Sequence, residues 1–301
     1  MAMNPFWQTS RFQIDLTRPR VMGIVNATPD SFSDGGTYFS SRSTASVLAH
    51  CEQLIKEGAD ILDIGGESTR PGAVALPLKE ELVRVLPVVR HAVTLGVPVS
   101  VDTYKPEVMR AVLDLGADII NDVWALRWAG TESGAQPLSG LQVVAQHPNC
   151  GVCLMHMYRE PLTMQTAPMT GDVVQQVRDF LQLVAQGLQG AGVDRTRIVL
   201  DVGVGFGKTV AQNLSLLQRQ SDVLSLGYPL LAGWSRKSSL AMLCADETDD
   251  VEVPTPLPVA ERLVPSIAAA LLAVERGARV VRVHDVRETV QALKVWTAAS
   301  L

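Results

Sequence analysis

The stretch VMGIVNATPDSFSDGG, residues 21–36, joins an apolar run to a polar segment rich in turn-forming residues. Residues 21–25 are apolar throughout or glycine, as expected of a strand that is buried on both faces. The next eleven residues contain one proline, two glycines, two aspartates and two serines, with Phe32 as their only large apolar side chain. Such a segment is either a plain surface connection or a loop that contacts a polar ligand.

The same order of a short apolar run, a polar loop and a longer helical stretch recurs along the chain. Strands that alternate with helices predict βαβ units and a parallel sheet. Eight such units favour a (β/α)8 barrel of the TIM type, one domain over residues 1–301, over a doubly wound sheet with a Gly-rich nucleotide loop. Residues 1–20 are expected to form an N-terminal extension with a short strand at FQIDL (12–16). The eight expected barrel strands are 21–26, 59–66, 97–103, 117–123, 150–157, 197–203, 229–235 and 279–286.

Composition excludes several classes of protein. The chain has 301 residues, a formal net charge of -5 and no basic run, which argues against nucleic acid as the main partner. One of the longest apolar runs, IAAALLAV (267–274), is too short to cross a membrane, and we interpret it as a buried helix face. The N-terminus lacks the apolar core of a signal peptide, so we expect a cytoplasmic protein.

Four cysteines do not suggest a disulfide framework in a chain of this length. Cys150 and Cys153 form a CxxC pattern inside a predicted strand, where residues three apart point to opposite faces. No second CxxC completes a zinc site. Reduced cysteines in the core are therefore favoured over a redox or metal role.

Polar residues occur repeatedly at the carboxyl ends of the predicted strands, where barrels carry their functional groups. One such residue alone is more often a loop or helix cap, but the recurrence at many strands favours a ligand site, because an unpaired buried carboxylate is costly. The residues are Asn26, Glu67, Thr69, Arg70, Asp102, Asn121, Asp122, His156, Asp201, Ser235, Arg236, Lys237, Ser238, Arg282 and His284.

The segment GVGFGKT (203–209) resembles a phosphate loop but does not match one. A Walker motif needs glycine where Val202 stands, and the dinucleotide pattern needs glycine where Lys208 stands. The glycines are better explained by a tight turn that places Phe206 at the mouth of the site.

The chemistry of the strand-end residues indicates the class of ligand. Asp102, Asn121 and Asp201 offer carboxylates and an amide, the groups that read the hydrogen-bonding edge of a heterocycle. Cationic donors suited to phosphate or pyrophosphate are Arg70, Arg282, His284 and Lys237. The two sets together predict a planar polar ring that bears a phosphorylated arm.

In eight segments the chain resembles the dihydropteroate synthase family. They are NATPDSFSDGG (26–36), DIGGESTRPGA (63–73), VDTYKPEV (101–108), IINDV (119–123), LMHM (154–157), DVGVGFGK (201–208), SRKS (235–238) and VRVHDVRETVQALK (281–294). The resemblance implies a (β/α)8 barrel that forms a homodimer. It also implies the condensation of 6-hydroxymethyl-7,8-dihydropterin diphosphate with 4-aminobenzoate, by dissociative displacement of diphosphate, and competition by sulfonamides.

Residue roles follow from the resemblance position by position. It implies catalytic roles for Asp102, Asp201, Lys237 and Arg70, and a Mg²⁺ ion near Asn26. The implied pterin-binding residues are Asp102, Asn121, Met155, Asp201, Phe206, Gly233 and Lys237. The implied diphosphate-binding residues are Asn26, Arg70, Arg282 and His284. The implied aminobenzoate-binding residues are Phe32, Thr69, Pro71, Phe206 and Ser238.

The chain departs from the family pattern in places. Pro265 stands where the family usually has glycine, which puts the start of the local helix in doubt, and residues 124–140 receive no role. Gly35 and Gly36 would let the first loop move as a lid over the site.

Two other functions remain open. One is the pterin-binding domain of a methyltransferase, and the other is a catalytically silent relative that binds pterin.

Overall fold

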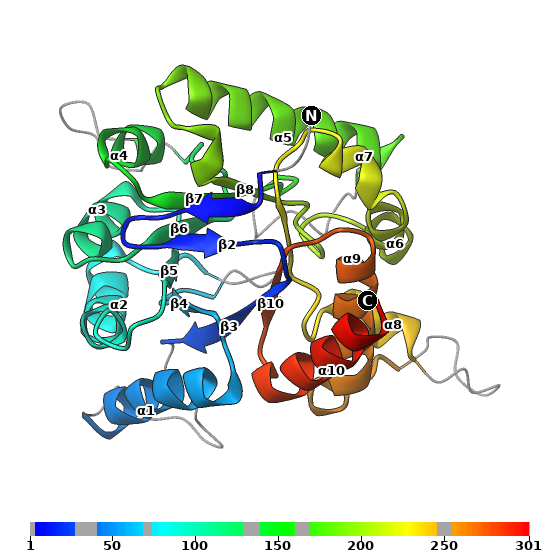
Figure 1. Cartoon of the computed structure of the whole chain (residues 1–301), viewed down its shortest axis with the longest axis horizontal. Coiled ribbons are helices and arrows are strands. Elements are labelled where there is room, and N and C mark those ends of the chain that lie inside the picture. Colours follow the sequence, from blue (N-terminus) through cyan, green and yellow to red (C-terminus); the bar gives the residue numbers. More distant parts are fainter. Residues whose placement is uncertain are drawn as a thin grey trace.

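The computed structural model describes residues 4–27, 41–68, 74–128, 139–159, 169–245 and 255–300, without the side chains of 41–43. Eight strands within this part of the chain are hydrogen-bonded in parallel and close into a barrel in the order β10-β3-β4-β5-β6-β7-β8-β9. The helices surround the barrel (Figure 1). The predicted (β/α)8 barrel is therefore confirmed.

Each predicted barrel strand is present, although most are shorter than predicted. Of residues 150–157, for example, only five are strand. The strands are β1 (Phe6–Gln8), β2 (Gln13–Asp15), β3 (Arg20–Asn26), β4 (Ile61–Gly65), β5 (Val99–Asp102), β6 (Ile119–Asp122), β7 (Gly151–Met155), β8 (Ile198–Asp201), β9 (Leu230–Ala232) and β10 (Val280–Val283).

Several helices begin at side chains that bind the first exposed backbone N–H groups, which have no partner within the helix. Ser139 and Thr209 each form a capping box with a glutamine three residues later. The helices are α1 (Ser41–Glu57), α2 (Leu78–Ala92), α3 (Pro106–Asp114), α4 (Gly140–Gln146), α5 (Val173–Gly190), α6 (Val210–Gln218), α7 (Gln220–Leu224), α8 (Ser238–Leu243), α9 (Leu263–Glu275) and α10 (Val286–Ala299), with 3-10 turns η2 (Arg195–Arg197) and η3 (Val259–Glu261).

An antiparallel hairpin of β1 and β2 covers one end of the barrel (Figure 1). Trp7 is fully buried there, and its indole Nε1 donates to the carbonyl oxygen of Arg197 at 2.9 Å. The apolar side chains of the hairpin pack against inward-facing residues near the start of the barrel strands. This cluster, which we call the barrel floor, comprises Trp7, Ile14, Leu16, Met22, Ile61, Ile119, Cys153, Val199, Leu231 and Val280.

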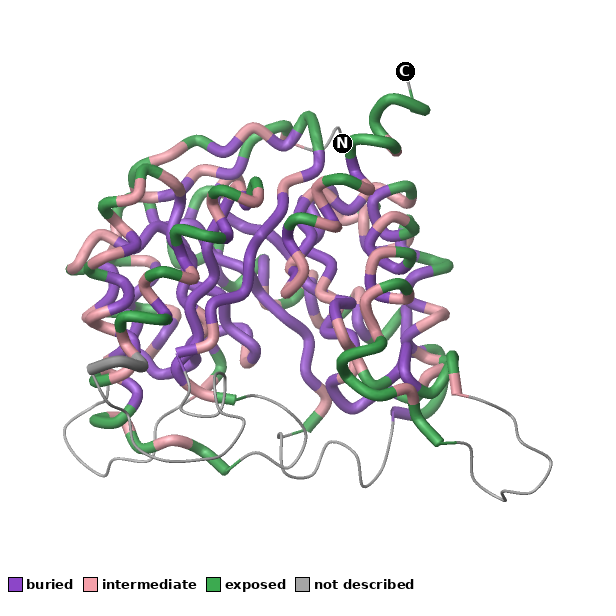
Figure 2. The backbone as a smooth tube through the Cα atoms, turned by 90° about the horizontal axis from the view of Figure 1, so that it is seen from below, coloured by how far each residue is buried: buried purple, intermediate pink, exposed green. Residues whose placement is uncertain are grey.

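A larger apolar core lies between the outer face of the strands and the helices. Buried positions gather in the strands and on the inner sides of the helices (Figure 2). Cys150 belongs to this outer core, whereas Cys153 belongs to the barrel floor. The two thiols therefore face opposite sides of the sheet, and both are free and buried, as predicted.

Helix α9 has the buried face expected from the sequence, and its other side is exposed. Ala269, Ala270 and Ala273 are buried, but Leu272 is 44% exposed, so the run 267–274 is buried on one side only. Pro265 is the third residue of the helix, where its missing N–H costs no intrahelical hydrogen bond. The proline is therefore compatible with the helix start.

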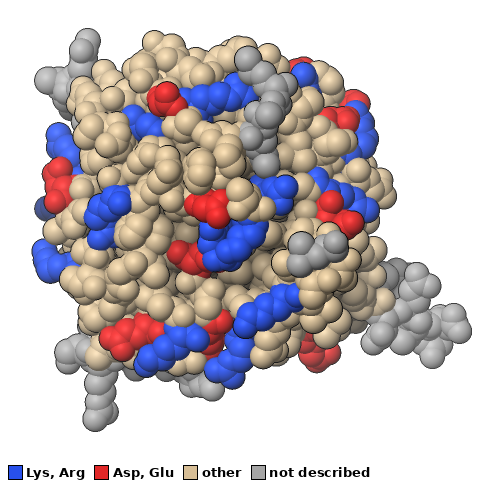
Figure 3. All heavy atoms as spheres, viewed as in Figure 1, with Lys and Arg blue, Asp and Glu red and all other residues tan. Residues whose placement is uncertain are grey.

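Charged side chains of both signs lie side by side on the face seen in Figure 3 and form no basic patch there. On the N-terminal segment, Arg18 and Arg20 both pair with Asp60, and Arg11 pairs with Asp118. Within the described residues, no helix combines the length and apolarity needed to span a membrane.

Candidate active site

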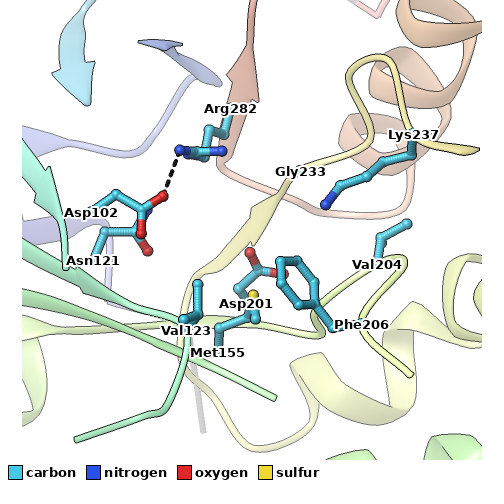
Figure 4. Close-up of a pocket in the computed structure, with 10 residues that line it drawn as sticks. All are labelled: Asp102, Asn121, Val123, Met155, Asp201, Val204, Phe206, Gly233, Lys237 and Arg282. Atoms are coloured by element: carbon cyan, nitrogen blue, oxygen red, sulfur yellow. Dashed lines mark hydrogen bonds and ion pairs between the residues drawn. The ribbon is translucent and has the colours of Figure 1, made fainter. Parts of the chain in front are cut away.

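A pocket opens at the end of the barrel opposite the hairpin, at the carboxyl ends of the strands. It holds about 420 Å³ of empty space, part of which is open solvent. In Figure 4, Asp102 and Asn121 lie on one side of this pocket, and Lys237 reaches in from the opposite side. The lining residues are Asp102, Asn121, Val123, Met155, Asp201, Val204, Phe206, Gly233, Lys237 and Arg282.

Strand geometry explains why these side chains meet. Side chains two apart on a strand point to the same face, so the residue two positions after a floor residue also points into the barrel. Asn121 follows Ile119 in this way, Asp201 follows Val199, and Arg282 follows Val280. The apolar floor thus changes, one layer further along the strands, into a layer of polar residues that faces the pocket.

Arg282 joins two carboxylates within this polar layer. Its Nε donates to Asp63 at 2.6 Å, and its Nη2 donates to Asp102 at 2.8 Å. Burial works against the charge on Arg282, but Asp63 and Asp102 outweigh that effect and raise its pKa. Burial also raises the pKa of Asp102 to about 7, although Arg282 opposes the shift. Protons and an ion pair therefore compete for Asp102 near neutral pH.

Asp201 lies at the end of β8 and also serves the turn that follows. Its Oδ1 accepts a hydrogen bond from the backbone N–H of Gly203 at 2.7 Å. Burial raises the pKa of Asp201, against this hydrogen bond and the nearby charges of Lys237 and Lys208. The same turn brings Phe206 into the pocket wall, as predicted.

Lys208 stabilises this turn through hydrogen bonds to backbone carbonyl oxygens. It is almost fully buried, and its Nζ donates to the carbonyl oxygens of Gly203, Phe206 and His156 at 2.8, 3.2 and 3.3 Å. Thr209 caps α6 rather than contacting a ligand. The segment 203–209 is therefore no phosphate loop, which confirms the sequence interpretation.

The loop after β9 carries Lys237 and is joined to β10. The Nζ of Lys237 lies 4.4 Å from the centre of the Phe206 ring. Arg236 has a φ of 58°, an uncommon backbone conformation for a residue other than glycine, and its side chain forms two hydrogen bonds with Asp285 at 2.5 and 3.1 Å. Ser266 of α9 accepts from the backbone N–H of Arg236 at 2.8 Å. These contacts hold the backbone that presents Lys237 to the pocket.

His284 is beside the pocket but is not a cation. Its Nδ1 and backbone N–H lie 2.9 and 3.1 Å from the hydroxyl oxygen of Ser235. Burial, together with the positive charges of Arg282 and Arg236, lowers the pKa of His284 to about 3. This shift favours a neutral ring near pH 7 rather than the cationic donor expected from the sequence, and the role of His284 at a diphosphate stays a prediction.

Three of the strand-end residues have structural partners instead of pocket positions. Asp122 accepts from the backbone N–H groups of Trp124 and Leu126, both at 2.7 Å, and so caps a turn. His156 is buried edge-on against Phe180. Glu67 binds Lys105, which also donates to the buried Glu81 at 2.5 Å. The simple capping or packing explanation holds for these residues.

The remaining predicted residues lie outside the pocket lining or outside the described part of the chain. Asn26 ends β3 and pairs in register with Gly65, and Ser238 is the exposed first residue of α8. Phe32, Thr69, Arg70 and Pro71 lie outside the described residues, as does the predicted lid with Gly35 and Gly36. Their roles stay predictions.

Sequence reasoning missed one buried residue in the polar layer, Asp63. It lies two positions after the floor residue Ile61 and contacts both Arg282 and Asn121. The spacing of two from an apolar position inside the barrel would have found it. The sequence prediction considered only the residues that follow strand 59–66.

Three comparisons connect this geometry to known proteins. A family model described as pterin binding enzyme matches residues 22–284. A dihydropteroate synthase of Neisseria meningitidis serogroup C is 48% identical over 297 residues, which cover 98% of each chain. The structure of Xanthomonas albilineans dihydropteroate synthase with 4-aminobenzoic acid shares 46% identity over 98% of each chain, with a TM-score of 0.84. That of the Burkholderia cenocepacia enzyme complexed with 7,8-dihydropteroate shares 46% identity over 100% of this chain and 98% of that chain, with a TM-score of 0.83.

Proposed function

Because this chain belongs to the dihydropteroate synthase family of pterin-binding enzymes, we propose that the pocket at its barrel mouth binds the pterin substrate of that reaction. The enzyme condenses 6-hydroxymethyl-7,8-dihydropterin diphosphate with 4-aminobenzoate to give 7,8-dihydropteroate and pyrophosphate. The observation that carries the binding proposal is the polar layer, in which Asp102, Asn121 and Asp201 surround one pocket with apolar walls at Met155 and Phe206.

These residue types suit a pterin for separate reasons. A carboxylate such as Asp201 can accept from two neighbouring N–H groups on one edge of the ring. Met155 and Phe206 offer apolar contacts to its faces. Lys237 and Arg282 lie at opposite sides of the pocket and bring positive charge to it (Figure 4). We infer that the pterin ring lies between them.

The proposed reaction is a displacement at the pterin methylene carbon. The carbon–oxygen bond to the diphosphate breaks, and both of its electrons leave with the diphosphate. The amine nitrogen of 4-aminobenzoate then forms the new carbon–nitrogen bond and releases one proton. Carboxylates of Asp102 and Asp201 beside the ring stabilise the positive charge that develops on it. Arg282, with Arg70 and His284, is proposed to bind the diphosphate as its charge grows.

A Mg²⁺ ion is proposed to accompany the diphosphate near Asn26, which would supply an amide oxygen. Within the described residues, no cluster of three or more His, Cys, Asp or Glu side chains is arranged to hold a metal ion. This donor set fits an ion that is bound mainly by substrate phosphate oxygens and water, as Mg²⁺ often is. When bound, the ion would neutralise part of the negative charge on the leaving group.

The experiment that tests the function measures pyrophosphate release from the pterin diphosphate. We expect release that depends on both 4-aminobenzoate and Mg²⁺, and competition between 4-aminobenzoate and a sulfonamide. Binding of the pterin without any pyrophosphate release would instead indicate the catalytically silent relative. Release that does not require an aromatic amine would argue against the proposed acceptor.

We also propose that the chain forms a homodimer through the exposed side of α9. Val264 and Leu272 are 74% and 44% exposed, and they lie with Ala268 along one stripe of the helix. Helix α10 packs beside α9 and exposes Val295 (Figure 1). Exposed apolar surface on a helix is typical of a protein interface, and a second copy of the chain offers the same stripe.

Light scattering tests the dimer. The unmodified chain is expected at twice its 32.4 kDa mass, and Val264→Glu is expected to shift it toward the monomer because a carboxylate would be buried unpaired. Leu183→Glu is the matched control, since Leu183 on α5 is also exposed, at 68%. A monomeric unmodified chain, or equal effects of both substitutions, would refute this interface.

A further inference from the structure

Asp63 is a fully buried carboxylate directly beneath the pocket, and it contacts no solvent. Its Oδ1 accepts from the hydroxyl of Ser100 at 2.6 Å, and its Oδ2 accepts from Nε of Arg282 at 2.6 Å. The side-chain nitrogen of Asn121 lies 3.3 and 3.4 Å from its two oxygens, a longer and shared contact. A buried carboxylate with three side-chain partners from three strands is costly to maintain unless they are well arranged.

The contact with Asp63 decides which way the Asn121 amide points. An ionised carboxylate can only accept hydrogen bonds, so the nitrogen of Asn121 must face Asp63. The oxygen of Asn121 is then directed away from Asp63, and Asn121 lines the pocket. The side-chain oxygen of Asn121 is thereby available in the pocket as a hydrogen-bond acceptor. It can accept from an N–H group of a ligand but cannot pair with a ring nitrogen that carries a lone pair.

The ion pair with Asp63 also orients Arg282. Asp63 binds Nε, at the inner end of the guanidinium, and Asp102 binds Nη2. Two fixed contacts at different nitrogens define the plane of this planar group, which a single contact would leave free to rotate. Asp63 thus acts on both sides of the pocket, on Asn121 and on Arg282.

We propose that Asp63 is a positioning residue for the reaction, one that sets the acceptor face of Asn121 and the plane of Arg282 without touching substrate. The proposal rests on the function proposed above. It assigns Asp63 to recognition of the pterin diphosphate and gives it no part in binding 4-aminobenzoate.

Asp63→Asn tests the assignment, because an amide of the same shape removes the charge and can face Asn121 with either end. We expect kcat/KM for the pterin diphosphate to fall about 10- to 100-fold, the loss typical of a hydrogen bond to a charged group. KM for 4-aminobenzoate should stay within about 2-fold.

The pH profile gives a readout that a merely structural role would not move. The charges around Asp102 are those of Arg282 on β10, Asp63 on β4, Asp122 on β6 and Glu81 on α2. Loss of the negative charge of Asp63 lowers the pKa of Asp102, so the acidic limb of kcat/KM should move to lower pH. An unmoved limb would overturn the proposal.

Asp118→Asn is the matched control. Asp118 is also fully buried and paired with an arginine, Arg11, but it directly precedes β6, at the end of the barrel away from the pocket. The Asp118→Asn substitution should lower the unfolding temperature and leave the pH profile of kcat/KM unchanged. If Asp63→Asn does not fold, Ser100→Ala keeps the ion pair but releases Asp63 Oδ1, and KM for the pterin diphosphate should rise about 3-fold. No rise would sink the proposal.

An assay of the unmodified enzyme distinguishes a failure of the proposed function from a failure of the proposed role of Asp63. If it releases no pyrophosphate, the proposed function fails before Asp63 is tested. If it is active and Asp63→Asn behaves identically, the function stands and the role of Asp63 is wrong.

Discussion

The side chain of Asp201 combines two tasks at one position, since one oxygen accepts from Gly203 while the residue lines the pocket. Asp201→Asn would put an amide N–H₂ where the proposed pterin contact needs an acceptor. We expect kcat/KM to fall at least about 100-fold, because a donor would then face a donor. The unfolding temperature should change little, since the volume is conserved. Activity near that of the unmodified enzyme would refute the assignment of Asp201 to the pterin.

Buried histidines make stability depend on pH. Burial, with Lys208 and Arg127 nearby, lowers the pKa of His156 from 6.5 to about 2. Folded His156 stays neutral while the unfolded chain binds a proton below pH 6.5. Its contribution is therefore complete above pH 6.5 and is lost as pH falls toward 2.

The corresponding prediction compares unfolding free energies at pH 7.5 and pH 5. The decrease between these values should be about 2 kcal/mol smaller in His156→Gln than in the unmodified chain, because glutamine does not titrate. Urea unfolding at the two pH values measures the difference. Equal decreases in both proteins would mean that His156 is protonated in the folded state.

At the scale of elements, the turn after β8 illustrates how backbone geometry supports the site. Gly203 has a φ of 68°, and a Cβ there would lie 1.9 Å from the carbonyl oxygen of His156. Gly116 also has a positive φ, of 97°, but a Cβ there meets nothing within 4 Å. Both glycines therefore have the left-handed backbone conformation, but only at Gly203 would a Cβ collide with a neighbouring backbone atom.

Alanine at each position separates the two effects. Gly116→Ala should cost about 1–2 kcal/mol of unfolding free energy, the cost of the left-handed conformation. Gly203→Ala should cost about 1–3 kcal/mol more, because the β8 turn must move, and it should also lower kcat/KM. Chemical denaturation and the pyrophosphate assay measure both. Similar values for the two variants would show that the turn tolerates the shift.

For the molecule as a whole, the barrel separates a floor that stabilises the fold from a rim that carries the chemistry. Trp7→Ala should lower the unfolding free energy by about 3–5 kcal/mol, since it empties the floor beneath the strands. Trp7→Phe keeps most of the apolar volume and loses the bond to Arg197, so it should cost about 1–3 kcal/mol.

Neither Trp7 substitution should change KM for the pterin diphosphate or 4-aminobenzoate, measured well below the unfolding temperature. A raised KM in Trp7→Phe would show that the barrel floor and the polar layer are coupled.

The cytoplasmic location expected from the N-terminal sequence stays a prediction.

The sequence alone determined the barrel, because its eight apolar runs alternate with helical stretches. This alternation can be recognised from neighbouring residues without any contact through space. It also identified Asp102, Asn121, Asp201, Lys237 and Arg282 as strand-end residues, and these meet in one pocket. The motifs were sufficient to indicate the family.

Tertiary structure decided what depends on contacts through space. The pairing of Arg282 with Asp63 joins residues 219 positions apart, and no spacing along the chain announces it. The neutral state of His284 depends on burial beside Arg282 and Arg236, which a sequence does not encode as a pattern. The closure of the barrel decided which polar residues line the pocket and which only hold their neighbours, because closure brings eight strand ends to one place.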